Sequence, residues 1–171
     1  GLREGRRQAQ MIFITLGSQK FQFNRLLIAV DELIDNGVIK EEVFAQTGYS
    51  DYKPRNYCFK KFLDREEFAD YEVKADIVIT HGGTGAIIGA VKKGKKVIAV
   101  PRLAKYGEHV DDHQLQLIAQ FKNQNLICGI DDCSEIEKGL DYVRNHVFNS
   151  YESNTYSIVK SIEMFIQEVT I

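Results

Sequence analysis

Two glycines and a threonine follow an apolar run and precede a run of small and aliphatic residues. The apolar run covers 77–80, and His81, Gly82, Gly83 and Thr84 come next. Glycine lets a ligand approach the backbone closely, and a helix start offers unpaired N–H groups at the positive end of the helix dipole. The pattern predicts an anion site, with a tight strand-to-helix turn that binds no ligand as the alternative. The segment lacks the lysine of a Walker loop and the full GxGxxG spacing.

A second glycine with a hydroxyl neighbour, Gly17–Ser18, ends the first apolar run of the chain, 11–16. An open backbone beside a hydroxyl group suits a contact with phosphate or sugar. An ordinary strand-to-helix turn uses the same residue types, so this pair alone does not distinguish a ligand site from a turn.

The third candidate segment, 100–117, carries many polar side chains after another apolar run. They include Arg102, Glu108, His109, Asp112 and Gln114. His109 and His113 are four residues apart and would share one face of a helix, where a zinc site is conceivable. The spacing is not that of the HExxH motif, so we expect capping and hydrogen-bonding roles and no metal site.

These segments need a scaffold that brings them together. Strands are expected at 11–16, 42–47, 57–62, 75–80, 96–101 and 126–130. Helices are expected at 23–36, 64–75, 84–93, 109–123, 134–146 and 154–168. Short apolar strands that alternate with helices predict a Rossmann-like, doubly wound α/β fold whose parallel sheet is covered on both faces. Ligands bind beyond the carboxyl ends of such strands, where all three candidate segments lie.

Two helix ends and one helix face carry further signals. Asp64 and Ser134 are expected to cap the helices that follow them. The last helix, 154–168, has an apolar stripe that either packs on the domain's own sheet or contacts a partner.

The composition is that of one globular domain. The chain has 171 residues, of which 44% are hydrophobic and 27% charged. Residues 1–10 show no apolar period and are interpreted as an expression remnant, which leaves 11–171 as a single domain. Without those ten residues, which contain three arginines and one glutamate, the net charge changes from −2 to −4. This charge disfavours nucleic-acid binding. No apolar run approaches the roughly 20 residues of a membrane span.

Four segments together resemble a known family. They are MIFITLGSQKFQFNRLL at 11–27, QTGYSDY at 46–52, ADIVITHGGTGAII at 75–88 and KKVIAVPRLAKYGEHVDDHQLQL at 95–117. The chain is similar to capsular and exopolysaccharide glycosyltransferase subunits of the PssE type, which belong with the C-terminal domain of glycosyltransferase family 28. It is also similar to the soluble subunit of the two-part dolichol-linked N-acetylglucosamine transferase.

The resemblance implies the donor-binding, C-terminal half of a GT-B glycosyltransferase. The donor would be a UDP-sugar, and a separate membrane-anchored subunit would bind the acceptor, a sugar on a polyprenyl diphosphate. Transfer would invert the anomeric centre without a metal or a cofactor, because a helix start can stabilise the leaving diphosphate. The chain would be cytoplasmic and peripheral at the inner face of the cell membrane through its partner.

The resemblance also assigns roles at the two glycine turns. Gly82, Gly83 and Thr84 match the turn that binds the diphosphate. Gly17 and Ser18 match the first glycine-rich loop of the family.

Further roles fall on the segments after the third and fifth strands. Phe62 and Leu63 match the segment whose backbone pairs with uracil, and Asp112 and Gln114 match an acidic-glutamine pair near the donor sugar. A partner carboxylate is a plausible general base, and His109 and Asp112 are the local candidates. The remaining substrate-binding candidates are His81, Arg102 and Glu108.

Two positions differ from the pattern of the related transferases. A glutamate that binds the ribose usually stands five residues before the glycine that matches Gly94, and here that position is Gly89. The first loop often reads Gly-Thr-His-Glu, whereas Gly17 is followed by Ser-Gln-Lys. These differences support a second hypothesis, a non-catalytic partner that activates or stabilises a membrane-anchored transferase. A nucleotide-sugar epimerase is disfavoured because that fold needs two such halves in one chain.

Overall fold

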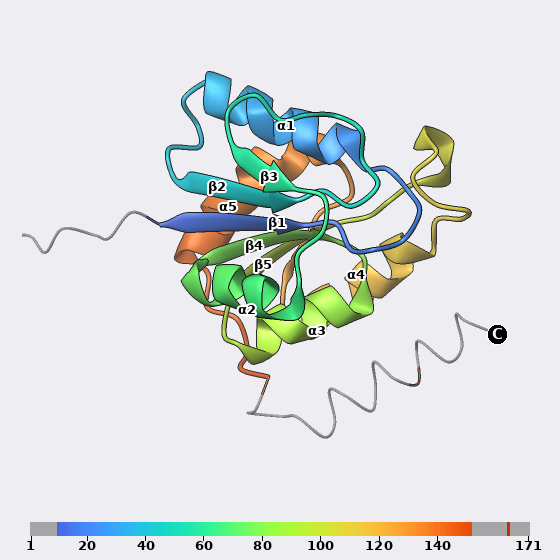
Figure 1. Ribbon diagram of the computed structural model, residues 1–171. Helices are drawn as coiled ribbons and strands as arrows, with labels where there is room; N and C mark the ends of the chain where they lie inside the picture. Colours follow the sequence, from blue (N-terminus) through green and yellow to red (C-terminus); the bar gives the residue numbers. More distant parts are fainter. Residues whose placement is uncertain (1–9, 152–163, 165–171) are drawn as a thin grey trace, which may run out of the picture.

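One parallel sheet of six strands organises the computed structural model, which describes residues 10–151 and 164. The strands lie in the order β3-β2-β1-β4-β5-β6, and all neighbours are parallel (Figure 1). Their bounds are β1 (Met11–Thr15), β2 (Glu42–Gln46), β3 (Cys58–Lys60), β4 (Ile77–His81), β5 (Lys96–Val100) and β6 (Cys128–Gly129). The predicted helix 154–168, apart from Met164, and the predicted remnant, apart from Gln10, lie outside the described residues.

Helices cover both faces of this sheet (Figure 1). On one face pack α1 (Asn24–Asp35) and α5 (Ile136–Asn145), and on the other α2 (Arg65–Lys74), α3 (Thr84–Lys92) and α4 (His113–Asn123). Two short 3-10 helices, η1 (Ala104–Tyr106) and η2 (Cys133–Glu135), precede α4 and α5. The arrangement confirms the predicted doubly wound α/β fold. Within the described ranges, no helix has the length and apolar character needed to cross a membrane.

Alternate residues of the central strands enter two separate cores. Ile12 and Ile14 of β1 pack on the side of α1 and α5, whereas Phe13 packs on the opposite side with Tyr71 of α2. Successive side chains of a strand point to opposite faces, and here both faces are covered. The strands that position the site therefore appear in the sequence as continuous apolar runs.

The strand order reverses between β1 and β4. From β1 the chain continues to β2 on one side, and from β4 it continues to β5 on the other. In doubly wound sheets, ligands bind in the crevice beyond the carboxyl ends of the strands at this point. β1 ends two residues before Gly17 and β4 ends one residue before Gly82. The fold thus brings the two predicted glycine turns to the same place.

Helix α4 begins at His113 and not at His109. Acidic side chains bind backbone N–H groups just ahead of it. Asp111 Oδ1 accepts from the His113 N–H at 3.1 Å, and Asp112 Oδ1 accepts from the Ala104 N–H at 2.8 Å. Such local side-chain acceptors favour turns over helix interiors. The prediction that the two histidines share a helix face is therefore wrong.

Of the two predicted helix caps, the one at Ser134 is wrong and the one at Asp64 is confirmed. Asp132, and not Ser134, caps the start of η2, because its carboxylate accepts from the Ser134 N–H at 2.9 Å. The Glu135 carboxylate accepts from the Asp132 N–H at 3.0 Å and completes a capping box. The predicted Asp64 cap is confirmed, since its Oδ1 accepts from the Glu67 N–H at 2.8 Å.

Candidate functional site

Gln114 joins the glycine turn after β4 to the loop after β5. Its Oε1 accepts from the Gly82 N–H at 3.0 Å and from the Arg102 N–H at 2.9 Å. The residue is buried, so either N–H group would lose its partner if the glutamine were removed. Gln114 therefore holds the backbone of the site, while its contact with a donor sugar stays a prediction.

His81 fills the space between the two glycine loops. A Cβ atom on Gly17 would lie 2.8 Å from His81 Nε2, and one on Gly83 would lie 2.5 Å from the same nitrogen. Both distances are too short for real contacts, so these positions require glycine. On the other side of the ring, Nδ1 lies 3.4 Å from the Gln114 amide nitrogen. With that amide as the donor, Nε2 carries the hydrogen and presents it beside the glycines.

The imidazole of His81 is neutral at physiological pH. Burial is the main cause that lowers the pKa of His81 to about 3, and the nearby Arg102 and His109 contribute in the same direction. A neutral ring can donate a hydrogen bond from Nε2 to an anionic ligand without titrating when the ligand arrives.

This pKa predicts a pH-dependent stability. The unfolded chain binds a proton at His81 below about pH 6.5 and the folded chain does not, so the free energy of unfolding falls as the pH drops from about 6.5 towards 3. At pH 5 the contribution is about 2 kcal/mol. Urea denaturation measures the free energy of unfolding at pH 7 and at pH 5. Between these pH values it should fall by about 2 kcal/mol less in His81→Gln than in the unaltered chain. An unchanged loss in the variant would show that His81 is not the group responsible.

A pocket of about 360 Å³ adjoins the glycine turns. Its lining comes from strand ends, loops and helices far apart in the chain, namely Thr15, Gly17, Ser18, Gln46, Phe62, Leu63, Phe68, Glu72, Gly85, Ala86 and Gly89. Four of these are predicted site residues, from the first glycine loop and from the segment after β3. The pocket thus joins the predicted uracil segment to the first turns of α3, which begins at Thr84.

Gln46, which is not among the predicted site residues, connects two walls of this pocket. Its Oε1 accepts from the Thr15 hydroxyl at 2.9 Å and from the Leu16 and Gly17 N–H groups at 3.2 Å each. Its amide nitrogen donates to the Gly17 carbonyl at 3.0 Å and to the Lys61 carbonyl at 2.8 Å. One buried side chain therefore positions the first glycine loop and the segment that leads to Phe62. A polar residue at the end of an apolar strand is the signal that could have revealed it.

The sequence of this chain matches one family model over almost its whole length. The model is the glycosyltransferase family 28 C-terminal domain, and residues 11–167 match it. The chain belongs to this family. Among curated proteins, the UDP-N-acetylglucosamine transferase subunit ALG13 of Kluyveromyces lactis is 31% identical over 97 residues. That match covers 56% of this chain and 46% of ALG13, so the chain spans about half the length of this relative.

Solved glycosyltransferase structures share the fold of the family 28 domain. The calicheamicin glycosyltransferase CalG4 superposes with a TM-score of 0.60 at 17% identity, over 96% of this chain and 39% of CalG4. MurG of Acinetobacter baumannii gives 0.54 at 16% identity, over 81% of this chain and 43% of MurG. The predicted fold, the Rossmann-like C-terminal half of a GT-B glycosyltransferase, is confirmed.

Arg102 places a buried positive charge beside the first glycine loop of the family 28 domain. Its Nη2 donates to the Leu16 carbonyl at 2.7 Å, one residue before Gly17. Its Nε and Nη1 have no hydrogen-bond partner among the described residues. Burial lowers the pKa of Arg102 to about 10, which leaves it charged at neutral pH. The charge favours an anion at this edge of the sheet.

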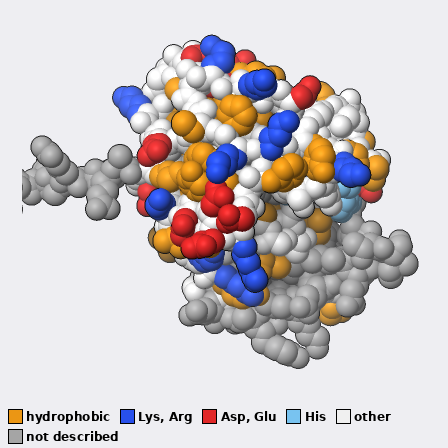
Figure 2. Space-filling model, viewed as in Figure 1, with side chains coloured by type: hydrophobic (Ala, Val, Ile, Leu, Met, Phe, Trp, Pro, Cys, Tyr) orange, Lys and Arg blue, Asp and Glu red, His pale blue; other side chains and the backbone are white. Residues whose placement is uncertain are grey.

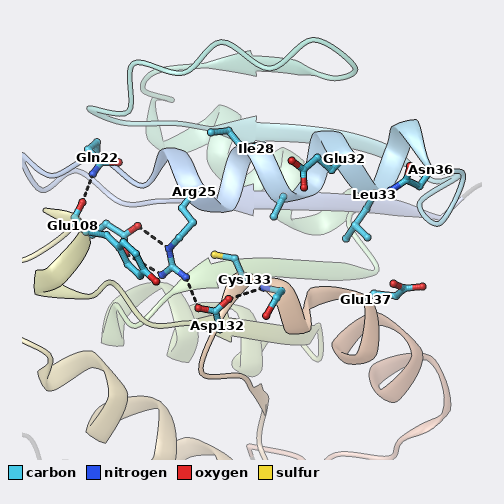
Figure 3. A pocket seen from close by; sticks show the side chains of 13 residues that line it. Gln22, Arg25, Ile28, Glu32, Leu33, Asn36, Glu108, Asp132, Cys133 and Glu137 are labelled. Atoms are coloured by element: carbon cyan, nitrogen blue, oxygen red, sulfur yellow. Dashed lines mark hydrogen bonds and ion pairs between the residues drawn. The ribbon is translucent and has the colours of Figure 1, made fainter.

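Glu108 lies in a different hollow of the family 28 domain, between α1 and the start of α5 (Figure 3). Its carboxylate accepts from Arg25 at 3.1 Å through each oxygen, and from the Leu103 N–H at 3.0 Å. Arg25 also binds Asp132 at 3.1 Å. Glu108 is fully buried, and it joins the loop after β5 to α1. It does not line the pocket that contains Gly17 and Phe62, and its predicted contact with substrate stays a prediction.

The two candidate bases also lie apart from that pocket lining. His109 and His113 both contact the Asp111 carboxylate, and ligand atoms of these three residues lie within 4.8 Å of one another. Three such groups could hold a metal ion with an open coordination position. Asp112 is exposed and its Oδ1 binds the Ala104 N–H. The role of His109 or Asp112 as a general base stays a prediction.

Proposed function

We propose that the chain is the donor-binding subunit of a two-component inverting glycosyltransferase. It takes a sugar from a UDP-sugar and delivers it to a sugar on a polyprenyl diphosphate, in capsule or exopolysaccharide biosynthesis. One observation carries the proposal: a pocket lined by the apolar residues Phe62 and Leu63 extends to the first glycine loop and to the first turn of α3. A nucleoside diphosphate needs a place for a flat base beside a place for phosphates. The relative ALG13, named as a UDP-N-acetylglucosamine transferase subunit, supports the donor class and the need for a second subunit.

The start of α3 binds the diphosphate in this proposal. The first N–H groups of a helix have no intrahelical partner and face an anion at the positive end of the dipole. The Thr84 hydroxyl and the neutral His81 ring add donors, and the charge of Arg102 lies nearby. These groups stabilise the negative charge that develops on the leaving UDP, so the reaction needs no metal.

A membrane-anchored partner binds the acceptor and completes the active site. The chain corresponds to 39% of CalG4 and 43% of MurG, and the remaining wall of the cleft comes from this second subunit. The partner also holds the chain at the inner face of the cell membrane, where the lipid-linked acceptor is reached.

Two observations favour a second candidate function, a non-catalytic activator of the membrane-anchored subunit. His109 and Asp112 do not line the pocket, and Gly89 lines it without a side chain. An activator of this kind would not need to bind UDP.

UDP is expected to protect the chain against unfolding. A ligand at 100 times its dissociation constant raises the free energy of unfolding by about 2.7 kcal/mol. The measurement is urea denaturation with and without UDP, repeated in EDTA, with uridine as a matched ligand that lacks the diphosphate. We expect strong protection by UDP, little by uridine, and no effect of EDTA. Absence of protection by UDP would favour the activator, and protection that requires a divalent metal would contradict the metal-free mechanism.

A further inference from the structure

Among the described residues, a single charged side chain lines the pocket beside the glycine turns. Glu72 of α2 is the one charged residue among the described residues that line it. Its side chain is only 3% exposed, and its Oε1 lies 2.7 Å from Nζ of Lys93 at the end of α3. Removing a carboxylate from water is unfavourable even when a counter-charge is present. A carboxylate can accept about four hydrogen bonds, of which this ion pair uses a part.

The wall of α3 in this pocket is open. Gly85 and Gly89 both line the pocket, and a Cβ atom on either would meet nothing within 4 Å. They are four residues apart and share one face of the helix. Glycine inside a helix is less favourable than alanine by about 1 kcal/mol, and packing does not demand it at either position. The two glycines instead leave room in the pocket that Glu72 lines.

The charge of Glu72 decides which part of a ligand can lie near it. A carboxylate accepts hydrogen bonds from hydroxyl groups and repels phosphate. Phosphates therefore belong at the start of α3, and a group with O–H donors belongs beside Glu72. In a nucleoside diphosphate, the sugar lies between the phosphates and the base, and its two neighbouring hydroxyls match the two oxygens of a carboxylate.

We propose that Glu72 binds the ribose hydroxyls of the nucleotide donor, with Lys93 as its counter-charge. The assignment rests on the proposed function and adds a residue that orients the donor. The base lies towards Phe62 and Leu63, the ribose at Glu72 and the diphosphate at the start of α3. The site then selects ribonucleotides over deoxyribonucleotides.

The first test uses the unaltered chain. Isothermal titration calorimetry compares UDP with 2′-deoxy-UDP, which has lost one of the two hydroxyls. We expect 2′-deoxy-UDP to bind about tenfold more weakly or worse, since hydrogen bonds to charged groups are of that strength. Equal affinities would overturn the proposal. If UDP itself fails to bind the unaltered chain, the proposed function fails, which is a different result.

The second test pairs Glu72→Gln with a control on the same helix. Glu66 lies in the exposed first turn of α2, where Figure 2 shows acidic side chains gathered, and Glu66→Gln should leave both affinities unchanged. Glu72→Gln should weaken UDP binding about tenfold and remove most of the preference for UDP over 2′-deoxy-UDP. An equal loss for both nucleotides would mean that Glu72 only shapes the pocket, and would overturn the assignment. If the variant does not fold, the comparison on the unaltered chain still decides.

Discussion

Gly83→Val combined with Thr84→Ala is expected to abolish UDP binding and leave the sheet folded. A Cβ atom at position 83 would lie 2.5 Å from His81 Nε2, and valine adds two further methyl groups. The ring of His81 is buried and lies against Gln114 on its other side, so the turn must move instead. The N–H groups at the start of α3 then no longer converge on the diphosphate, and Thr84→Ala removes a hydroxyl donor. A misplacement of about 1 Å in such a site can reduce activity about a hundredfold.

Gly139→Ala is the matched control for this experiment. Gly139 lies inside α5 on the other face of the sheet, and its added Cβ would make ordinary contacts, the nearest at 3.5 Å from Ile98. The substitution should leave UDP affinity unchanged and stability equal or slightly higher. Calorimetry measures affinity, and urea denaturation establishes that each variant is folded. Normal UDP affinity in a folded Gly83→Val, Thr84→Ala variant would show that the diphosphate does not bind at this turn.

Continuous apolar strands made the fold predictable from the sequence. Residues 11–15, 77–81 and 96–100 are buried on both faces of the sheet, apart from the half-buried Lys96, and short runs of this kind between helices leave few alternatives to a doubly wound sheet. In a parallel sheet, the turns that follow the strands all lie at the carboxyl edge of the sheet. The two glycine turns could therefore be placed together from topology alone.

The start of α4 could not be predicted because two signals compete there. The i, i+4 spacing of His109 and His113 suggests a helix, whereas Asp111 and Asp112 offer side-chain acceptors to nearby N–H groups. The acceptors prevail, as the hydrogen bonds to His113 and Ala104 show. The two rings still lie together, with centroids 4.9 Å apart, and both contact the Asp111 carboxylate, although His109 lies outside α4.

The roles of Gln46 and Glu72 depend on contacts between distant parts of the chain. Gln46 connects the Gly17 loop to Lys61, and Glu72 meets Lys93 across two helices. Gln46 opens the QTGYSDY segment and Glu72 lies in no motif, but neither position reveals from the sequence which distant residue the side chain contacts. Position 89 is a further example. Glycine there indicates from the sequence that the pocket has no carboxylate, whereas the structure shows that Glu72 of α2 lines the same pocket.

The chain by itself is expected to show almost no sugar transfer, and co-expression with a membrane-anchored acceptor subunit should produce activity. In the proposed function the pocket of this chain binds the nucleotide, and neither His109 nor Asp112 lines that pocket as a base. A positioned general base typically contributes about 10²–10⁴-fold to the rate, and alignment of the two substrates contributes further. Both depend on the second wall of the cleft, so the difference in turnover should be at least about a hundredfold.

Three preparations separate a catalytic subunit from an activator: the partner alone, the partner with the unaltered chain, and the partner with the Gly83→Val, Thr84→Ala chain. Each is assayed for transfer from a UDP-sugar to a polyprenyl-diphosphate-linked sugar, with pull-down to establish that both chains form the complex. If this chain binds the donor, the altered complex assembles but is inactive, because the diphosphate site of this chain has been lost. Full activity of the altered complex would mean that the chain acts only by stabilising its partner. Robust turnover by the chain alone on a soluble acceptor analogue would contradict the two-component proposal itself, since one sheet would then supply both walls of the active site.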